Sequence, residues 1–166
     1  ERGQVTPYYH TRPTKIQKNI TPGVGKREDF NLEIIRKFAF YIVNKGKDCK
    51  AKKIATVIPG SSASDIRPQE YTQALIEGII LGAYQFDKYK GKNEESQECK
   101  IGEVVIVTED SGKAKPSRKE DLMVGLNWGR LVSEAVNMAR DIGNEPPNII
   151  TPLSFADLAR KVATDC

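Results

Sequence analysis

Few residues of this chain have the types and spacing that nucleophilic catalysis needs. His10 is the only histidine. A Ser-His-Asp hydrolase would have to pair it with Ser61, Ser62 or Ser64, and none of these serines lies in the Gly-x-Ser-x-Gly elbow that exposes a nucleophile. A single histidine also leaves a zinc site short of its usual nitrogen ligands. The sequence therefore favours neither serine hydrolysis nor a histidine-rich metal site.

The carboxylates and the cysteines are not spaced as metal ligands either. Neighbouring side chains point to different faces of a strand or helix, so adjacent acidic residues do not converge on one ion. The acidic pairs are Glu28-Asp29, Glu94-Glu95, Glu109-Asp110 and Glu120-Asp121. The cysteines, which we interpret as free thiols, are widely and irregularly spaced: Cys49, Cys99 and Cys166. The sequence thus assigns no catalytic, cofactor-binding or metal-binding residue.

A glycine turn at residues 23–26 invites comparison with a phosphate-binding loop. A Walker loop needs a glycine five positions before Gly25, where Ile20 stands, and a Ser or Thr after Lys26, where Arg27 stands. The backbone amides of the turn are still able to hold an anion in a nest. Because the specific spacing fails, a structural turn is the favoured interpretation.

Two basic segments keep nucleic-acid binding open as an alternative. They run from Lys45 to Lys53 and from Lys113 to Lys119. If the segments converged, they would form a patch for the backbone of DNA or RNA. No aromatic residues are interleaved with these lysines. Solvated turns are therefore the simpler interpretation.

Length and composition suit one domain with a fragment of another. The chain has 166 residues, 39% of them hydrophobic and 29% charged, which is typical of soluble globular proteins. No apolar run approaches the ~20 residues of a membrane helix, so no membrane partner is expected. The sequence begins at Glu1 without an initiator Met or an apolar signal region, so we expect either an engineered or a processing boundary there.

Helical and strand patterns alternate through the middle of the chain. Asn31 is a candidate cap for a helix that fades at Gly46, and Pro68 opens another helix. Two runs of apolar, largely β-branched residues, 54–58 and 104–107, are typical of buried strands. Residues 15–22 are polar and end in proline, which disfavours a central strand there. The alternation predicts an α/β layer fold with a largely parallel sheet.

The C-terminal third is predicted to hold a long helix, a stiff connector and a second helix. Ser117 and Glu120 have capping-box spacing, and Gly143 is a candidate left-handed residue that ends the long helix. Two adjacent prolines exclude a helix at residues 144–147, and Pro152 opens the next one. The predicted apolar face of the long helix is Val124, Trp128, Leu131, Ala135, Met138 and Ile142. Such a face needs a partner, so we expect this chain to end inside a larger protein.

Three stretches carry a family resemblance. Residues 134–152, Glu-Ala-Val-Asn-Met-Ala-Arg-Asp-Ile-Gly-Asn-Glu-Pro-Pro-Asn-Ile-Ile-Thr-Pro, resemble the interdomain segment of the leucyl (cytosol) aminopeptidases. Residues 77–90 resemble the family's glycine-containing helix that ends in aromatic-Asp, and residues 23–30 resemble the turn before its first helix. The interdomain segment is the specific signal.

The resemblance implies a fold and a parent activity. The expected fold is a three-layer, macro-domain-like α/β domain with a mixed, mostly parallel sheet and flanking helices. Residues 1–142 would be a non-catalytic N-terminal domain, and residues 143–166 a connector with the first helix of a truncated catalytic domain. The parent would be a cytoplasmic homohexameric exopeptidase that uses two zinc or manganese ions to release leucine-like N-terminal residues from peptides. This fragment would scaffold assembly and site access, with the catalytic domain and the other subunits as its partners.

Other consequences of the resemblance are negative or remain alternatives. The family's metal-binding motifs, Phe-Asp-Ser-Gly-Gly and Asn-Thr-Asp-Ala-Glu-Gly-Arg, do not occur in this chain, so no catalytic or metal residue is carried over and the fragment alone is predicted to be inactive. Some bacterial relatives double as DNA-binding accessory proteins. The likeness to macro domains also suggests an ADP-ribose or nucleotide-binding module, with the Gly23 turn and the Gly60–Ser64 loop near a diphosphate.

Overall fold

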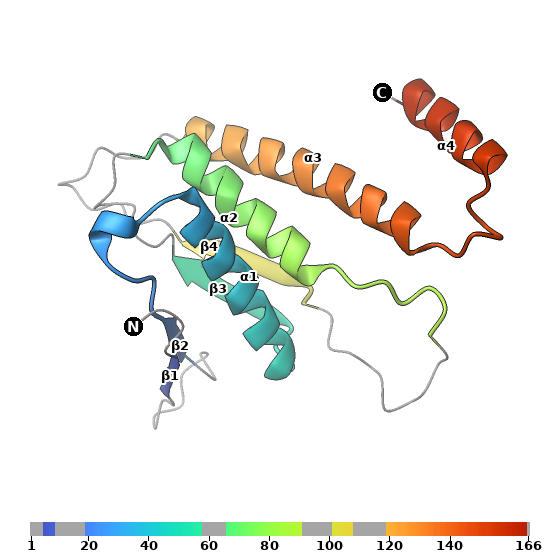
Figure 1. Ribbon diagram of the computed structural model, residues 1–166. Coiled ribbons are helices and arrows are strands. Elements are labelled where there is room, and N and C mark those ends of the chain that lie inside the picture. The colour runs from blue at the N-terminus through green and yellow to red at the C-terminus, as the bar shows by residue number, and fades with distance from the viewer. Residues whose placement is uncertain (1–4, 9–18, 58–65, 91–100, 108–118, 166) are drawn as a thin grey trace.

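Helices dominate the structure of the chain, a computed structural model that describes residues 5–8, 19–57, 66–90, 101–107 and 119–165. Figure 1 shows α2 between α1 and α3, with the paired strands β3 and β4 beside α1 and α2. The elements, in chain order, are β1 (Val5–Tyr8), β2 (Asn19–Pro22), the 3-10 turn η1 (Arg27–Asp29), α1 (Leu32–Asp48), β3 (Lys53–Val57), α2 (Pro68–Ala83), β4 (Glu103–Val107), α3 (Lys119–Asn144) and α4 (Pro152–Asp165).

The described strands form two separate pairs. β3 and β4 are parallel, with Lys53 opposite Glu103 and Val57 opposite Val107, which confirms the parallel pairing expected from their sequences. β1 and β2 form an antiparallel pair apart from this sheet. Residues 19–22 are therefore a strand, but not a central one. The protein is a mixed α/β fold with a small parallel sheet.

The apolar core lies between α1, α2 and one face of β4. Asn31 caps α1 as predicted, because its Oδ1 accepts hydrogen bonds from the amides of Glu33 and Ile34 at 3.0 and 3.1 Å. Val104 and Ile106 of β4 pack against the core. The fully or almost fully buried core residues are Ile35, Ala39, Val43, Tyr71, Ala74, Leu75 and Ile79.

Close backbone approach brings α1 and α2 together. A Cβ at Gly78 would lie 2.4 Å from the carbonyl oxygen of Arg36, so only glycine permits this crossing. Beside it, the side chain of Glu77 is only 7% exposed and accepts hydrogen bonds from Arg36 Nε at 2.6 Å and from Gln73 Nε2 at 2.8 Å. The pairing satisfies a carboxylate that would otherwise be costly to bury.

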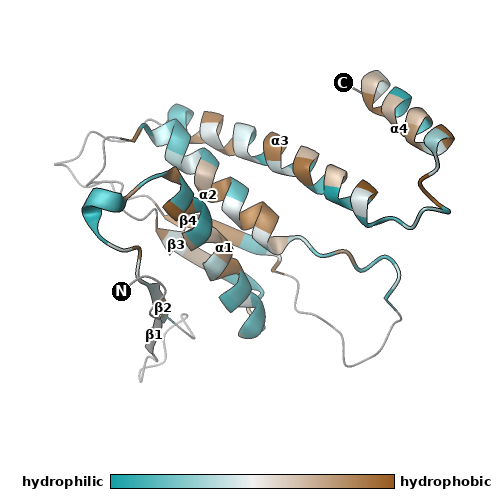
Figure 2. Ribbon diagram, in the orientation of Figure 1, coloured by the Kyte–Doolittle hydropathy of each residue, from teal (hydrophilic) through white to brown (hydrophobic). Residues whose placement is uncertain are grey.

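α3 packs on α2 through a face that the sequence analysis did not single out. The small-residue face of α3, formed by Gly125, Gly129 and Ser133, is the buried one. A Cβ at Gly125 would lie 2.3 Å from the carbonyl oxygen of Gln69, which shows how closely α2 and α3 approach. The predicted apolar face points elsewhere: Trp128 is 55% and Leu131 58% exposed. Figure 2 shows apolar colour along α3 and α4 as well as on α1 and α2.

The end of α3 also differs from the prediction. Gly143 has no left-handed φ, and the helix continues to Asn144. The amide of Glu145 still donates to the carbonyl oxygen of Asp141 at 3.1 Å, so the helical pattern persists past the glycine. The predicted cap residue Ser117 lies outside the described residues.

α4 follows the sequence prediction, whereas the exclusion of a helix at residues 144–147 is wrong at Asn144, which is the last residue of α3. α4 begins at Pro152, and Thr151 Oγ1 accepts a hydrogen bond from the amide of Ser154 at 3.3 Å. Figure 1 shows α4 standing apart from the helices α1 to α3. Within the described ranges, no helix is both long enough and apolar enough to cross a membrane.

Candidate functional site: the joint at the end of α3

Most of the residues considered for chemistry do not come together. Glu28 and Asp29 lie exposed in η1, and Gly25 takes a φ of 89° in the turn before it. Asp121 Oδ1 accepts a hydrogen bond from Gln69 Nε2 at 2.9 Å and so belongs to the α2–α3 interface. Cys49 is the half-buried residue that follows α1, and Glu120 lies exposed in the first turn of α3. The remaining residues weighed for catalysis or metal binding lie outside the described parts of the chain: His10, Ser61, Ser62, Ser64, Glu94, Glu95, Cys99, Glu109, Asp110 and Cys166.

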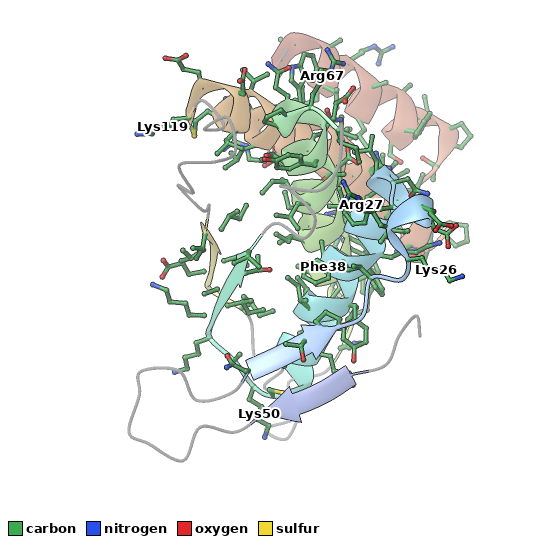
Figure 3. All side chains as sticks on the ribbon, turned by 90° about the vertical axis from the view of Figure 1, so that its left-hand side faces the viewer. Lys26, Arg27, Phe38, Lys50, Arg67 and Lys119 are labelled. Atoms are coloured by element: carbon green, nitrogen blue, oxygen red, sulfur yellow. The ribbon has the colours of Figure 1, made fainter. Side chains whose placement is uncertain are left out.

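The described basic residues do not form one patch. In Figure 3, Lys50 and Lys119 lie at opposite ends of the molecule. Lys45 pairs with Asp48, and Lys53 pairs with Glu103, both at 2.9 Å. Lys113, Lys115 and Arg118 lie outside the described residues. The nucleic-acid interpretation gains no support from the described geometry.

Lys47 has a structural task that its sequence context did not reveal. Its Nζ donates hydrogen bonds to the carbonyl oxygens of Gly82 and Ala83 at 3.0 and 3.1 Å. These carbonyls belong to the last turn of α2, where the helix dipole favours a positive charge. Lys47 therefore caps α2 from α1.

A cluster of polar contacts, here called the joint, gathers where α2 and α3 end and links residues 84–89 to residues 140–145. The segment that follows α2, residues 84–90, turns toward the last two turns of α3. Tyr84 donates its hydroxyl proton to Asp141 Oδ1 at 2.8 Å and accepts a hydrogen bond from Asn144 Nδ2 at 3.0 Å. Arg140 stacks its guanidinium over the Tyr84 ring, 5.4 Å from the ring centre. Burial and the Asp141 hydrogen bond raise the pKa of Tyr84, which keeps the phenol protonated as a donor.

Glu145 is the second anchor of this joint. Its carboxylate accepts a hydrogen bond from Lys88 Nζ at 2.6 Å and another from the hydroxyl of Tyr89. The Lys88 bond, followed by the Tyr89 bond, lowers the pKa of Glu145 below its usual value, and the Glu145 bond raises the pKa of Lys88. The Glu145 side chain is only 10% exposed, whereas that of Lys88 is 57% exposed. Two side chains of the 84–90 segment thus hold Glu145, the first residue after α3.

The connector itself is ordered by local hydrogen bonds. The amides of Ile149 and Ile150 both donate to the carbonyl oxygen of Pro146, at 2.9 and 3.1 Å. Ser154 Oγ donates to the carbonyl oxygen of Ile149 at 2.8 Å and accepts a hydrogen bond from the amide of Thr151 at 2.9 Å. Together with the fixed φ of two prolines, these bonds set the direction in which the chain leaves α3.

The described contacts of the joint order the start of the connector. Among the described residues, no three His, Cys, Asp or Glu side chains lie close enough to hold a metal ion. Its members are separated by more than fifty positions in sequence, as in the Tyr84–Asp141 and Lys88–Glu145 pairs. Sequence reasoning missed them because no short motif links residues so distant. The only available signal was that both stretches belong to the segments that carry the family resemblance.

Comparisons with known proteins agree with that resemblance. Residues 1–93 match the family described as "Cytosol aminopeptidase family, N-terminal domain". A probable cytosol aminopeptidase of Sulfurihydrogenibium sp. (strain YO3AOP1) is 36% identical over 153 residues, covering 91% of this chain and 28% of the relative. One from Aquifex aeolicus (strain VF5) is 34% identical and covers 93% and 28% respectively. The chain therefore spans less than a third of the length of these curated relatives.

Solved structures share the fold over nearly the whole chain. The bottromycin maturation enzyme BotP in complex with Mn superposes with a TM-score of 0.75 at 24% identity, covering 99% of this chain and 31% of that one. A tomato leucine aminopeptidase variant superposes with a TM-score of 0.77 at 17% identity, covering 99% and 30%. The family match spans more than half of the chain, and relatives and structures extend it to the C-terminal helices. This chain belongs to the cytosol aminopeptidase family, and it is homologous to the N-terminal part of those enzymes.

Proposed function

We propose that the chain is the non-catalytic N-terminal domain of a leucyl aminopeptidase-like exopeptidase. In this assignment residues 1–142 are the domain, and residues 143–166 are the connector with the first helix of a catalytic domain. The complete N-terminal domain would be three-layered and macro-domain-like. The chain's own task would be to hold the catalytic domain in place and to shape access to its site.

The observation that carries this proposal is the large open apolar face of α3. Trp128 and Leu131 are more than half exposed although they recur at helical spacing. In α4, which Figure 1 shows apart from the other helices, Leu153 is 80% and Phe155 51% exposed. Apolar faces of this kind need a partner. Since the relatives are more than three times as long as the matched region, their remaining length is the natural candidate.

The parent's chemistry follows from the family and not from this chain. A pair of zinc or manganese ions would activate a water molecule and polarise the peptide carbonyl in the catalytic domain. BotP, a relative in fold, was solved with manganese. We assign the parent to the cytoplasm, with a hexamer as its assembly and peptides as its substrates.

An activity comparison tests the proposal. The 166-residue chain and the full open reading frame that contains it are purified and assayed for leucine release from leucine p-nitroanilide with Mn²⁺ or Zn²⁺. We expect turnover only from the longer protein, and we expect EDTA to abolish it. Metal-dependent turnover by the 166-residue chain alone would contradict the proposal, and so would a reading frame that stops at Cys166.

The role of the joint is tested in the longer protein. Glu145→Gln removes the charge that Lys88 and Tyr89 bind, and Glu134→Gln removes a carboxylate from an exposed position of the same helix. If the joint positions the catalytic domain, Glu145→Gln lowers kcat/KM and Glu134→Gln leaves it unchanged. Equal values for both variants would show that the joint has no positioning role.

A further inference from the structure

The face of α3 that points away from α2 carries a continuous apolar seam. Gly125, Gly129 and Ser133 form the buried side of the helix. On the opposite side, apolar residues recur at alternating spacings of four and three positions; these residues, here called the α3 seam, are Val124, Trp128, Leu131, Ala135, Met138 and Ile142. At such spacings the side chains of one helix fit between those of a second helix that runs alongside it. The seam is therefore shaped for a helix.

The charged residues in this part of α3 lie beside the seam and not in it. At about 3.6 residues per turn, the charged residues between Val124 and Ile142 fall on other sides of the helix: Arg130, Glu134, Arg140 and Asp141. Trp128 and Leu131 are more than half exposed, so the centre of the seam is open to solvent. A partner can thus cover the seam without burying a charge, which would be costly.

The α3 seam is complementary to a second copy of itself. In a two-fold contact, residue i of one copy touches residue j of the other, and the reverse also holds. If two α3 helices run antiparallel and cross between Leu131 and Val132, Trp128 of each copy lies opposite Ala135 of the other. The largest side chain of the seam then meets the smallest, whereas a parallel pair would place two tryptophans in one layer and two alanines in another. The sizes of the seam residues therefore favour an antiparallel pair.

The charges beside the seam favour the same alignment. Arg130 and Glu134 lie on one flank of α3, and their side chains are 65% and 61% exposed. In the antiparallel register, Arg130 of each copy lies beside Glu134 of the other, so unlike charges meet at two equivalent places. Each exposed pair contributes little to the affinity, but the pairs help to select this register over others.

The size of the seam sets the strength of the contact. A fully buried aromatic side chain covers about 150–250 Å² and an aliphatic one less, so the exposed parts of the seam and of Val132 come to roughly 450 Å² per copy. The total of about 900 Å² is at the low end for specific interfaces, where complexes are weak. We expect a dissociation constant of roughly 100 μM, so that the chain is almost entirely monomeric at about 2 μM.

We infer that the 166-residue chain forms a weak, two-fold symmetric dimer in which two α3 helices pack antiparallel through the α3 seam. The association withdraws Trp128 and Leu131 from water. This inference does not depend on the proposed function. In a longer protein, a catalytic domain on the same face would compete with the second copy. The dimer is therefore expected of the 166-residue chain, and its absence would leave the outcome of the activity comparison unchanged.

The concentration dependence of the unaltered chain provides the first test. The chain has one tryptophan, Trp128, so tryptophan fluorescence reports on the centre of the seam. Between about 5 and 500 μM, which spans the expected dissociation constant, we expect the weight-average mass from sedimentation equilibrium to rise from 18.5 kDa toward twice that value. The emission of Trp128 should shift to shorter wavelengths over the same range. A constant mass, or a rising mass without a shift in emission, would overturn the inference.

Two substitutions at similarly exposed positions provide the second test. Leu131→Asp places a charge at the centre of the seam. Because the substitution occurs twice in a two-fold dimer, it should weaken dimerisation by at least about tenfold. Phe40→Gln is the matched control: Phe40 is 52% exposed on α1, which lies on the other side of α2 from α3 (Figure 1), and dimerisation should be unchanged. Undiminished association of the Leu131→Asp variant, or equal weakening by Phe40→Gln, would assign the association to another surface and overturn the inference.

A charge exchange tests the antiparallel register. Glu134→Arg brings like charges together at two equivalent places, so it should weaken dimerisation by about fivefold or more. Combining it with Arg130→Glu restores unlike charges both across the dimer and within each helix, and it should return the dissociation constant to that of the unaltered chain. If the single substitution has no effect, or if the combination does not restore binding, the antiparallel register is wrong and the inference falls.

Discussion

The two faces of α3 differ in the size of their side chains and in how far those side chains are exposed. The small-residue face packs on α2 so closely that a Cβ at Gly125 or Gly129 would clash with a backbone oxygen of α2. The apolar face, with Trp128 and Leu131, carries the larger side chains and remains more than half exposed at these positions. Helical periodicity therefore predicts where an apolar stripe lies, but it does not predict which partner covers that stripe. Within this chain, closeness of backbone approach decided the contact.

The largest expected effect contrasts two leucines. Leu75 is fully buried in the core, and Leu131 is 58% exposed on the apolar face of α3. Leu75→Ala should lower the free energy of unfolding by about 2–5 kcal/mol, because it leaves a cavity. Leu131→Ala should change it by less than about 0.5 kcal/mol. Urea denaturation followed by circular dichroism measures both values.

Equal losses for the two leucine variants would mean that the apolar face is already covered within this chain. The contrast is sharpened in the longer protein. There, Leu131→Ala should become clearly destabilising if the catalytic domain covers the apolar face.

A second contrast uses one substitution at two positions of α3. Gly125→Ala places a methyl group 2.3 Å from the Gln69 carbonyl oxygen, so α2 and α3 must separate. We expect a loss of about 1–3 kcal/mol, the usual range for overpacking. Gly143→Ala meets no atom within 4 Å and should gain up to about 1 kcal/mol from helix propensity. Thermal unfolding of the two variants and of the unaltered 166-residue chain measures both effects. A gain of stability in both variants would show that α2 and α3 are not packed closely enough at Gly125 to exclude a methyl group.

Thr72 allows a smaller test of the same interface. Its side chain lies on α2 where α3 passes, and its Oγ1 is buried with no hydrogen-bond partner among the described residues. Thr72→Val replaces the hydroxyl by a methyl group of similar size, which removes an unsatisfied group. We expect a gain of about 1 kcal/mol in urea denaturation. A loss of stability would indicate that the hydroxyl has a partner after all.

The smallest effect on overall stability is expected at the joint, where the change is local and depends on pH. Because the folded-state pKa of Glu145 is lowered, its contribution is present above the usual carboxylate pKa of about 4.3 and is lost as the pH falls through the lowered value. Protection of the amides of Glu145 and Ile149 from hydrogen exchange should therefore fall in acid. The Glu145→Gln variant should show low protection at neutral pH as well. Unchanged protection in that variant would show that the Glu145 carboxylate does not stabilise the joint.

Local sequence signals predicted the elements well where one residue type decides the backbone. The Asn31 cap, the proline at the start of α2 and the Thr151–Pro152 start of α4 are confirmed. Gly143 was assigned wrongly as a helix terminator, because glycine permits a left-handed φ but does not impose it. The contacts of the joint were not predictable, since they unite residues 84–89 with residues 141–145 and no local pattern records which distant side chains meet.

The sequence alone indicated the family, through the resemblance of residues 134–152, 77–90 and 23–30. It determined the order of elements from α1 to α4, because caps, prolines and apolar periodicity act over a few residues. It also determined that α3 has an apolar stripe. Only the tertiary structure decided that the glycine and serine face is the one that packs on α2, and that Tyr84 and Lys88 meet the end of α3. Both depend on how closely two backbones approach, and that distance is a property of the assembled helices and not of either helix alone.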